Sequence, residues 1–202
     1  MKSVMLSIKP QWCEKIASGE KTIEVRKSAP KETPFKCYIY CCKDNAQEIV
    51  LLKDYKNRFS FGDYRNADGH FYDVANRTVI GEFICNKVDK YTFSSYEAEY
   101  RVNHIEQQMM CLNHPDLIRY GKGEPLYGLH ISDLKIYDKP KELSKFTSPR
   151  VCGNYKDLPA YIHVGCNMCK YSYTINCMIK CRIDGREPLT RPPQAWMYVE
   201  EI

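Results

Sequence analysis

The sequence predicts a single α+β domain whose short strands form a barrel-like sheet with flanking helices. Its 202 residues are 44% hydrophobic and 27% charged, a balance typical of one globular domain with a full core. Segments with a strand pattern recur along the chain, but only two segments show a helical pattern. Strands and helices do not alternate regularly, which argues against a doubly wound parallel sheet.

The N-terminal part of the chain predicts a strand, a helix and two more strands. Residues 4–8 are apolar and indicate a buried strand. Pro10 suits the first position of the helix that follows, and Gly19 is placed to end it. Residues 21–26 and 36–42 indicate the next two strands.

Residues 21–26 alternate in the manner of a strand that is buried on one side only. Ile23 and Val25 are expected on one face, and Glu24 and Arg26 on the other, together with Thr22. The polar face of this strand is therefore a candidate for contact with solvent or a ligand.

The rest of the chain predicts a loop, a helix and more strands. Residues 54–77 are polar and rich in Asp, Asn, Gly and Arg, which indicates a long loop or a variable insert. Residues 96–112 indicate a helix, followed by a turn-rich stretch with Gly121 and Gly123. Three further strands are predicted at residues 78–90, 127–137 and 195–200.

The charge balance permits an anionic partner without requiring one. The net charge is +5 and the isoelectric point about 8.5, below the strongly basic range of dedicated duplex-binding domains. No run approaches the roughly 20 apolar residues of a membrane span, and the N-terminus has no signal-peptide pattern. We therefore expect a cytoplasmic protein that does not bind membranes.

The eleven cysteines fall into two groups. In a reducing compartment they are expected to be core thiols or metal ligands and not disulfides. The first group lies among apolar residues and indicates small core side chains: Cys13, Cys37, Cys41, Cys42, Cys85 and Cys111. The second group crowds into 30 residues near the C-terminus: Cys152, Cys166, Cys169, Cys177 and Cys181.

The second group has the spacing of a zinc site. Cys166 and Cys169 form a CxxC pair, and Cys177 and Cys181 follow with three residues between them. Four such thiolates can hold one tetrahedral ion at about 2.3 Å, and four protein ligands leave no position for a catalytic water. We expect a structural zinc knuckle within residues 150–187, with Cys152 and His163 as spare ligands; free thiols and disulfides formed during preparation are the alternatives.

Three segments resemble the ASCH family. They are residues 5–12 continuing into 18–26, residues 128–137 and residues 191–200. The first contains the most specific pattern, a strand and helix followed by Ser-Gly-Glu-Lys-Thr-Ile-Glu-Val-Arg. The latter two look like an uncharacterised bacterial and phage subgroup of the family. The resemblance spans nearly the whole chain, although residues 43–77 and 150–187 add little to it.

The resemblance implies a PUA-like β-barrel over residues 1–149 and 188–202, with the Cys-rich insert between them. It also implies a cleft beside the first helix that binds RNA or DNA, since related barrels grip flipped or modified bases. The candidate binding residues are Lys9, Trp12, Lys21, Glu24 and Arg26. Lysine and arginine suit phosphates or base edges, tryptophan suits stacking, and glutamate can accept from an exocyclic amine. Their alternative roles are core packing for the tryptophan and a surface ion pair for the glutamate and arginine.

An enzymatic role is the first alternative. One branch of the family resembles an amidohydrolase that uses a lysine, a threonine three residues later and a distant glutamate. Lys21 matches the lysine, but Glu24 stands at the threonine position, and a carboxylate does not replace a hydroxyl nucleophile. Glu97 and Glu99 are candidates for the distant acid. A different hydrolysis of modified nucleosides or RNA would use Lys21 and Glu24 together.

The leading interpretation is a nucleic-acid-binding domain that recognises RNA, a single strand or a modified nucleotide. A small hydrolase is the first alternative and a protein-interaction adaptor the second. A binder should show affinity that falls with salt, a hydrolase should turn over modified nucleosides, and an adaptor should expose an apolar patch.

Overall fold

The structure is a computed structural model that describes residues 1–43, 49–51, 59–61, 75–148 and 188–202. In these ranges the chain is mostly β-sheet with three α-helices and one short 3-10 helix. The predicted zinc knuckle, residues 150–187, and most of the predicted loop at 54–77 lie outside the described residues.

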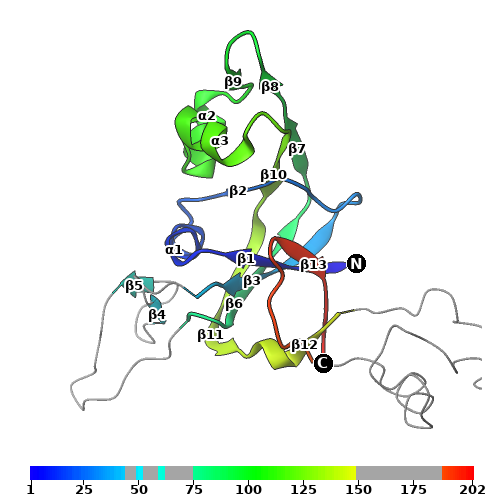
Figure 1. Ribbon diagram of the computed structural model, residues 1–202. Coiled ribbons are helices and arrows are strands. Elements are labelled where there is room, and N and C mark those ends of the chain that lie inside the picture. The colour runs from blue at the N-terminus through cyan, green and yellow to red at the C-terminus, as the bar shows by residue number, and fades with distance from the viewer. Residues whose placement is uncertain (44–48, 52–58, 62–74, 149–187) are drawn as a thin grey trace, which may run out of the picture.

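The larger sheet has five strands in the order β11-β6-β3-β1-β13 (Figure 1). Their bounds are β1 (Ser3–Ile8), β3 (Phe35–Cys41), β6 (Val79–Cys85), β11 (Ser132–Lys141) and β13 (Trp196–Tyr198). β1 and β3 run parallel, with Ile8 opposite Cys41, and the other neighbours are antiparallel. The C-terminal segment thus returns to pair with the N-terminal strand.

The smaller sheet has three antiparallel strands in the order β2-β10-β7. Their bounds are β2 (Ile23–Arg26), β7 (Val88–Tyr91) and β10 (Leu126–His130). The single strands predicted at 78–90 and 127–137 are each two strands, because the chain leaves the larger sheet after Cys85 and enters it after Ile131. The two sheets are therefore continuous through these bends, but the described residues do not form a closed barrel.

Two asparagine caps define the helices at the far end of the smaller sheet (Figure 1). α2 (His104–Met110) begins at Asn103, which forms a reciprocal capping box with Glu106. α3 (His114–Gly121) begins at Asn113, whose side chain accepts from the Asp116 N–H. α1 (Pro10–Ala17) begins at its proline, as predicted.

The helix predicted at 96–112 is wrong in its first half, where β8 (Phe93–Ser94) and β9 (Glu99–Tyr100) form a small hairpin. Ala98, at a φ of 54°, turns the chain there. The turn-rich stretch predicted with Gly121 and Gly123 is wrong at Gly121, where α3 ends, but a turn does follow at Gly123. A Cβ on Gly121 would lie 1.8 Å from the Tyr100 hydroxyl, so this glycine permits α3 to pack on the hairpin.

The remaining elements are short pairs. β4 (Ile49–Leu51) pairs with β5 (Phe59–Phe61), so the region predicted as a loop contains a strand. β12 (Phe146–Thr147) pairs with β14 (Glu200–Glu201), next to the 3-10 helix Leu143–Lys145. The strand predicted at 195–200 is therefore divided between β13 and β14.

The smaller sheet lies between two separate hydrophobic clusters. One cluster joins α1 to the inner face of β1 and β3 and includes Leu129 of β10. The other joins Ile23 and Val25 of β2 to α2 and α3. A third cluster covers the opposite face of the larger sheet around Met5. Both faces of β2 are consequently buried, and its polar face does not meet solvent as the alternation predicted.

Candidate nucleic-acid interface

Three charged side chains of the predicted site converge on β2 and its entry. One carboxylate oxygen of Glu24 lies 3.6 Å from the Lys21 ammonium, and the other lies 2.9 Å from the Arg26 guanidinium. The exposed fractions are 2% for Lys21, 5% for Glu24 and 7% for Arg26. The predicted grouping is present, but these side chains do not line an open hollow.

The burial of Glu24 and Arg26 follows from the position of β2. The alternation of the strand turns Ile23 and Val25 toward α2 and α3, so Glu24 and Arg26 face α1 and the larger sheet. Arg26 donates to the Ser7 carbonyl of β1 at 2.8 Å and to the Ala195 carbonyl at 3.4 Å. The arginine thereby connects the smaller sheet to both ends of the chain.

Lys21 is held from the helical side. Its ammonium donates to the Met110 carbonyl at the end of α2 and lies 5.1 Å from the centre of the Trp12 ring. Burial lowers the pKa of the Lys21 ammonium, and the negative charge of Glu24 opposes that shift. Trp12 is half-buried and packs on the core cluster of α1, which agrees with the packing role, and its role in stacking stays a prediction.

The buried charges are unbalanced, because two cations share a single carboxylate. The Nε of Arg26 is also buried, and within the described ranges it has no hydrogen-bond partner. A buried donor without a partner usually costs about 1–3 kcal/mol. The arrangement therefore favours an additional acceptor or an anion near this end of β2.

Two exposed lysines and two aromatic rings border the buried charges. Lys9 is exposed, and it acts with Arg26 to lower the pKa of the Cys42 thiol, although burial outweighs them and raises that pKa. On the other side, Lys27 lies 5.3 Å from the centre of the Tyr120 ring. We call Lys9, Trp12, Lys27 and Tyr120 the β2 rim.

Tyr120 is absent from the site predicted from sequence, because the sequence predicts turns where α3 lies. It is 39% exposed, and burial raises the pKa of its hydroxyl; the positive charge of Arg26 opposes this shift, and the negative charge of Glu24 adds to it. The Asn113 cap and the proline after His114 were the signals that could have revealed its helix.

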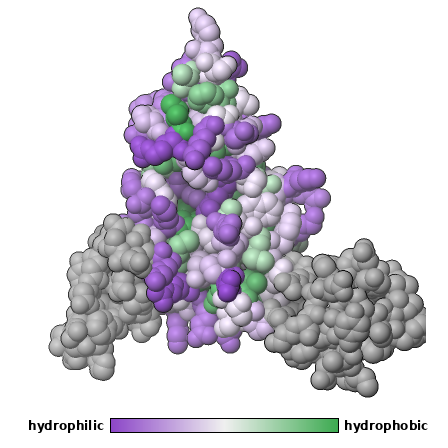
Figure 2. All heavy atoms as spheres, in the orientation of Figure 1, coloured by the Kyte–Doolittle hydropathy of each residue, from purple (hydrophilic) through white to green (hydrophobic). Residues whose placement is uncertain are grey.

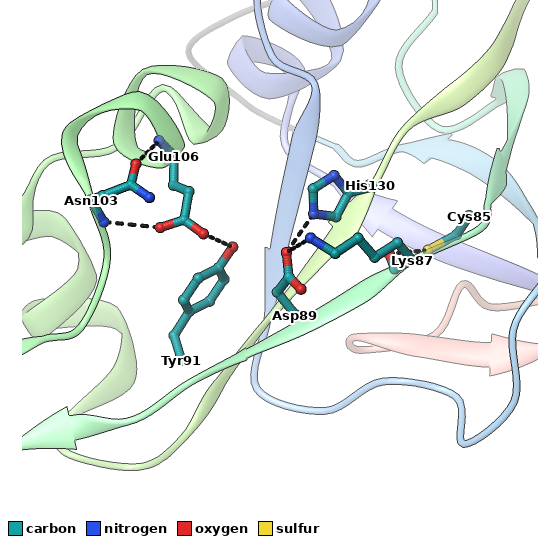
Figure 3. Close-up of polar contacts among 7 residues, drawn as sticks. All are labelled: Cys85, Lys87, Asp89, Tyr91, Asn103, Glu106 and His130. Carbon is teal, nitrogen blue, oxygen red and sulfur yellow. Dashed lines mark hydrogen bonds and ion pairs between the residues drawn. The ribbon is translucent and has the colours of Figure 1, made fainter.

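A second polar cluster connects β7 to its neighbours (Figure 3). One carboxylate oxygen of Asp89 lies 2.7 Å from the His130 Nε2 and 2.7 Å from the Lys87 ammonium. Burial opposes the ionisation of Asp89, but these two partners outweigh it and lower its pKa. Two residues along β7, the Tyr91 hydroxyl donates to Glu106 of the α2 capping box at 3.3 Å.

The β7 cluster has the character of a structural support. Asp89 pairs with Lys87 and with His130 of β10, and Tyr91 pairs with Glu106 of α2, so the contacts in Figure 3 join neighbouring segments. His130 thus serves to join β10 to β7 through Asp89.

The cysteines of the first group are free thiols, as expected. Cys13, Cys37, Cys41 and Cys85 are buried, whereas Cys42 and Cys111 are half-buried. Among the described residues, no group of three or more His, Cys, Asp or Glu side chains is arranged to hold a metal ion. The predicted ligands Cys166, Cys169, Cys177 and Cys181, with the spares Cys152 and His163, lie outside these residues.

Solved structures with a similar fold come from Zymomonas mobilis. The crystal structure of ASCH from that organism is 18% identical, with a TM-score of 0.42, and covers 70% of this chain and 74% of its own. A Ser-to-Ala variant of the same protein is 15% identical, with a TM-score of 0.48; the match covers 98% of this chain and 87% of the variant. A Tyr-to-Phe variant is 16% identical, with a TM-score of 0.45; the match covers 71% of this chain and 77% of the variant.

These neighbours are ASCH proteins. ASCH is also the family that the motifs of this chain resemble. No protein-family model matches the sequence, and the comparison with curated proteins gave no match.

Proposed function

We propose that this chain is a nucleic-acid-binding domain that recognises RNA, a single strand or a modified nucleotide at the β2 rim. The observation that carries the proposal is the excess positive charge beneath this rim, where Lys21 and Arg26 share the carboxylate of Glu24. An approaching phosphate would compensate that charge, and the exposed Lys9 and Lys27 would contact it first.

The aromatic rings of the rim fit a single strand better than a regular duplex. Trp12 and Tyr120 each carry a lysine ammonium near one ring face. Bases stack on such rings when they are unpaired, and the stacking tolerates any sequence. The proposal therefore assigns the phosphates to the lysines and the bases to the rings, and it does not require Lys21, Glu24 or Arg26 to be exposed.

Fluorescence anisotropy with a single-stranded RNA of about ten nucleotides tests the proposal. Each phosphate contact to a single strand contributes about 0.7 to the dependence of log affinity on log salt. The Lys9→Ala/Lys27→Ala double variant should thus bind more weakly and lose about 1.4 of that slope. A matched double variant of the exposed β11 lysines, Lys135→Ala/Lys139→Ala, should keep it; equal losses in the two variants would refute the proposal.

A hydrolase acting on modified nucleosides or RNA is the second candidate, favoured by one observation. The pKa of Lys21 is lowered by burial, and Glu24 lies 3.6 Å away, which is the environment that makes an amine a base or nucleophile. A panel of acylated nucleosides tests it. Turnover that disappears in Lys21→Arg would support this candidate, because arginine keeps the charge but does not deprotonate.

The adaptor alternative finds less support on the described surface. The face in Figure 2 is mostly hydrophilic, with hydrophobic side chains gathered near α2 and α3. Three large exposed hydrophobic residues lie on α2 and α3, namely Ile105, Ile118 and Tyr120, whereas Met1, Tyr96 and Ile202 lie elsewhere in the described fold. None of the described helices is long and apolar enough to cross a membrane.

We also propose that the Cys-rich segment binds one structural zinc ion. The support is the spacing of two cysteine pairs, Cys166 with Cys169 and Cys177 with Cys181, and their separation from the core thiols. Zinc binding would contribute folding free energy to a segment whose sequence shows little hydrophobic periodicity.

A further inference from the structure

A hollow of about 500 Å³ opens beside the start of β2, and none of its lining residues belongs to the β2 rim. Its lining comes from the end of α1, the turn before β2 and the end of α2: Lys15, Glu20, Thr22, Gln108, Met109 and Cys111. A volume of this size falls within the range of small-molecule sites in proteins.

The walls of the hollow are fixed to one another. The Lys21 N–H donates to the Lys15 carbonyl at 2.8 Å, and the Thr22 N–H donates to the Met109 carbonyl at 2.9 Å. The buried Lys21 ammonium donates to the Met110 carbonyl between two lining residues. Because these bonds hold α1, β2 and α2 in place, a ligand would enter a preformed site and would not have to order it.

The residues that line the hollow have no net formal charge and include both polar and apolar side chains. The only cation and anion of the lining, Lys15 and Glu20, form an ion pair at 2.6 Å. The Cys111 thiol donates to the same carboxylate, with Sγ 3.7 Å from it, and burial raises the pKa of this thiol. A phosphate would find no free positive charge among these groups, so the hollow does not resemble an anion site.

The uncharged residues of the lining suit a flat, uncharged ring with donors and acceptors at its edge. The Gln108 side chain is exposed and can donate and accept at once, as glutamine does toward base edges. Met109 and Cys111 provide polarizable sulfur for the ring itself, and the Thr22 hydroxyl can donate or accept.

We propose that this hollow binds one unpaired nucleobase of a single-stranded nucleic acid. The inference deepens the proposed function and rests on it for the identity of the ligand. Thr22 and Arg26 are four residues apart along an extended segment, a distance of about 13 Å. A single strand can span that distance, with its phosphates at the β2 rim and one base in the hollow.

Methyl NMR of the protein labelled at its methionines tests the site with free ribonucleosides as the probe. The ring current of a bound base should shift the Met109 methyl signal, assigned through Met109→Leu, on addition of at least one of the four ribonucleosides. The methyl signal of Met5, which is fully buried in another cluster, should not move. Since nucleosides carry no phosphate, the shift should not depend on salt.

The single-stranded RNA then links the hollow to the β2 rim. Gln108→Ala should weaken its binding about tenfold, the size of one good base contact, whereas Ile105→Ala, on the same helix and 67% exposed, should not. RNA binding that is unchanged in Gln108→Ala, with a Met109 signal that nucleosides do not shift, would overturn the inference and leave the proposed function standing. A Met109 shift without any RNA binding would support the hollow as a nucleoside site and overturn the proposed function.

Discussion

The Glu24 carboxylate lies 2.9 Å from the Arg26 guanidinium and 3.6 Å from the Lys21 ammonium, and all three side chains are buried. The carboxylate is thus the shared counter-charge of two cations at the centre of the fold. Desolvation makes such groups costly, and removal of one partner leaves the others uncompensated. The stability of the domain should therefore depend on Glu24 more than on any surface ion pair.

Replacement of Glu24 by glutamine should destabilise the protein by about 3–5 kcal/mol, because it leaves two buried cations without a negative partner. Urea unfolding with linear extrapolation measures the free energy of unfolding. Glu32→Gln is the matched control, since Glu32 pairs with Lys2 at 2.8 Å on the open surface, where an ion pair contributes little to stability. Similar losses in the two variants would contradict the importance of the buried carboxylate.

The lowered pKa of Lys21 predicts a specific pH dependence of stability. The unfolded chain holds this proton up to the ordinary pKa of 10.5, whereas the folded chain releases it at a lower pH. Between these two values the unfolded state binds more protons, so the contribution of Lys21 to the free energy of unfolding rises with pH. Below the lowered pKa both states are protonated, and the contribution is constant.

The difference in unfolding free energy between the unmodified protein and Lys21→Met measures this contribution. It should increase in favour of the unmodified protein as the pH rises from neutrality toward 10.5. Taking the difference removes the tyrosines, which titrate in both proteins at high pH. A difference that stays flat or falls over this interval would show that the folded state does not depress the pKa of Lys21.

The strands of the fold were predictable from sequence, but their bends were not. Alternation and β-branched residues located β1, β2 and β3 within about two residues. Strand-forming residues continue on both sides of Asn86 and of Ile131, and neither bend contains a proline or a glycine that would mark it. The points at which the chain passes from one sheet to the other depend on tertiary packing. The alternation of polar and apolar residues along a strand does not predict them.

The sequence predicts that Lys21, Glu24 and Arg26 lie close together, but it does not predict that they are buried. The spacing of Lys21, Glu24 and Arg26 on one strand correctly brought them together. Sequence gave no sign that α1 would cover that strand face while α2 and α3 cover the other, since polar residues on a strand usually meet water. The asparagine caps at 103 and 113 were readable signals for the helices that complete the site.

Zinc should be present at one ion per chain in protein purified without chelators, as measured by elemental mass spectrometry. The Cys166→Ser/Cys169→Ser double variant should lose it, because two of four ligands are removed. Cys42→Ser, which changes a half-buried thiol of the described fold, should retain it. Zinc retained in the double variant, or lost equally in Cys42→Ser, would exclude these cysteines as the ligands.

Tyr120→Ala should weaken the binding of single-stranded RNA by about 1–3 kcal/mol, which corresponds to roughly 5- to 150-fold in the dissociation constant. The reason is that the variant removes a stacking face from the β2 rim without changing the net charge, so the dependence of affinity on salt should stay the same. Tyr96→Ala is the control, because Tyr96 is 98% exposed in the turn between β8 and β9 and belongs to no part of the proposed site. Anisotropy titrations at two salt concentrations separate the outcomes. A loss of affinity confined to Tyr120→Ala places a base against this ring, whereas equal losses in the two variants would mean that RNA is held by general contacts with exposed tyrosines and not by the rim.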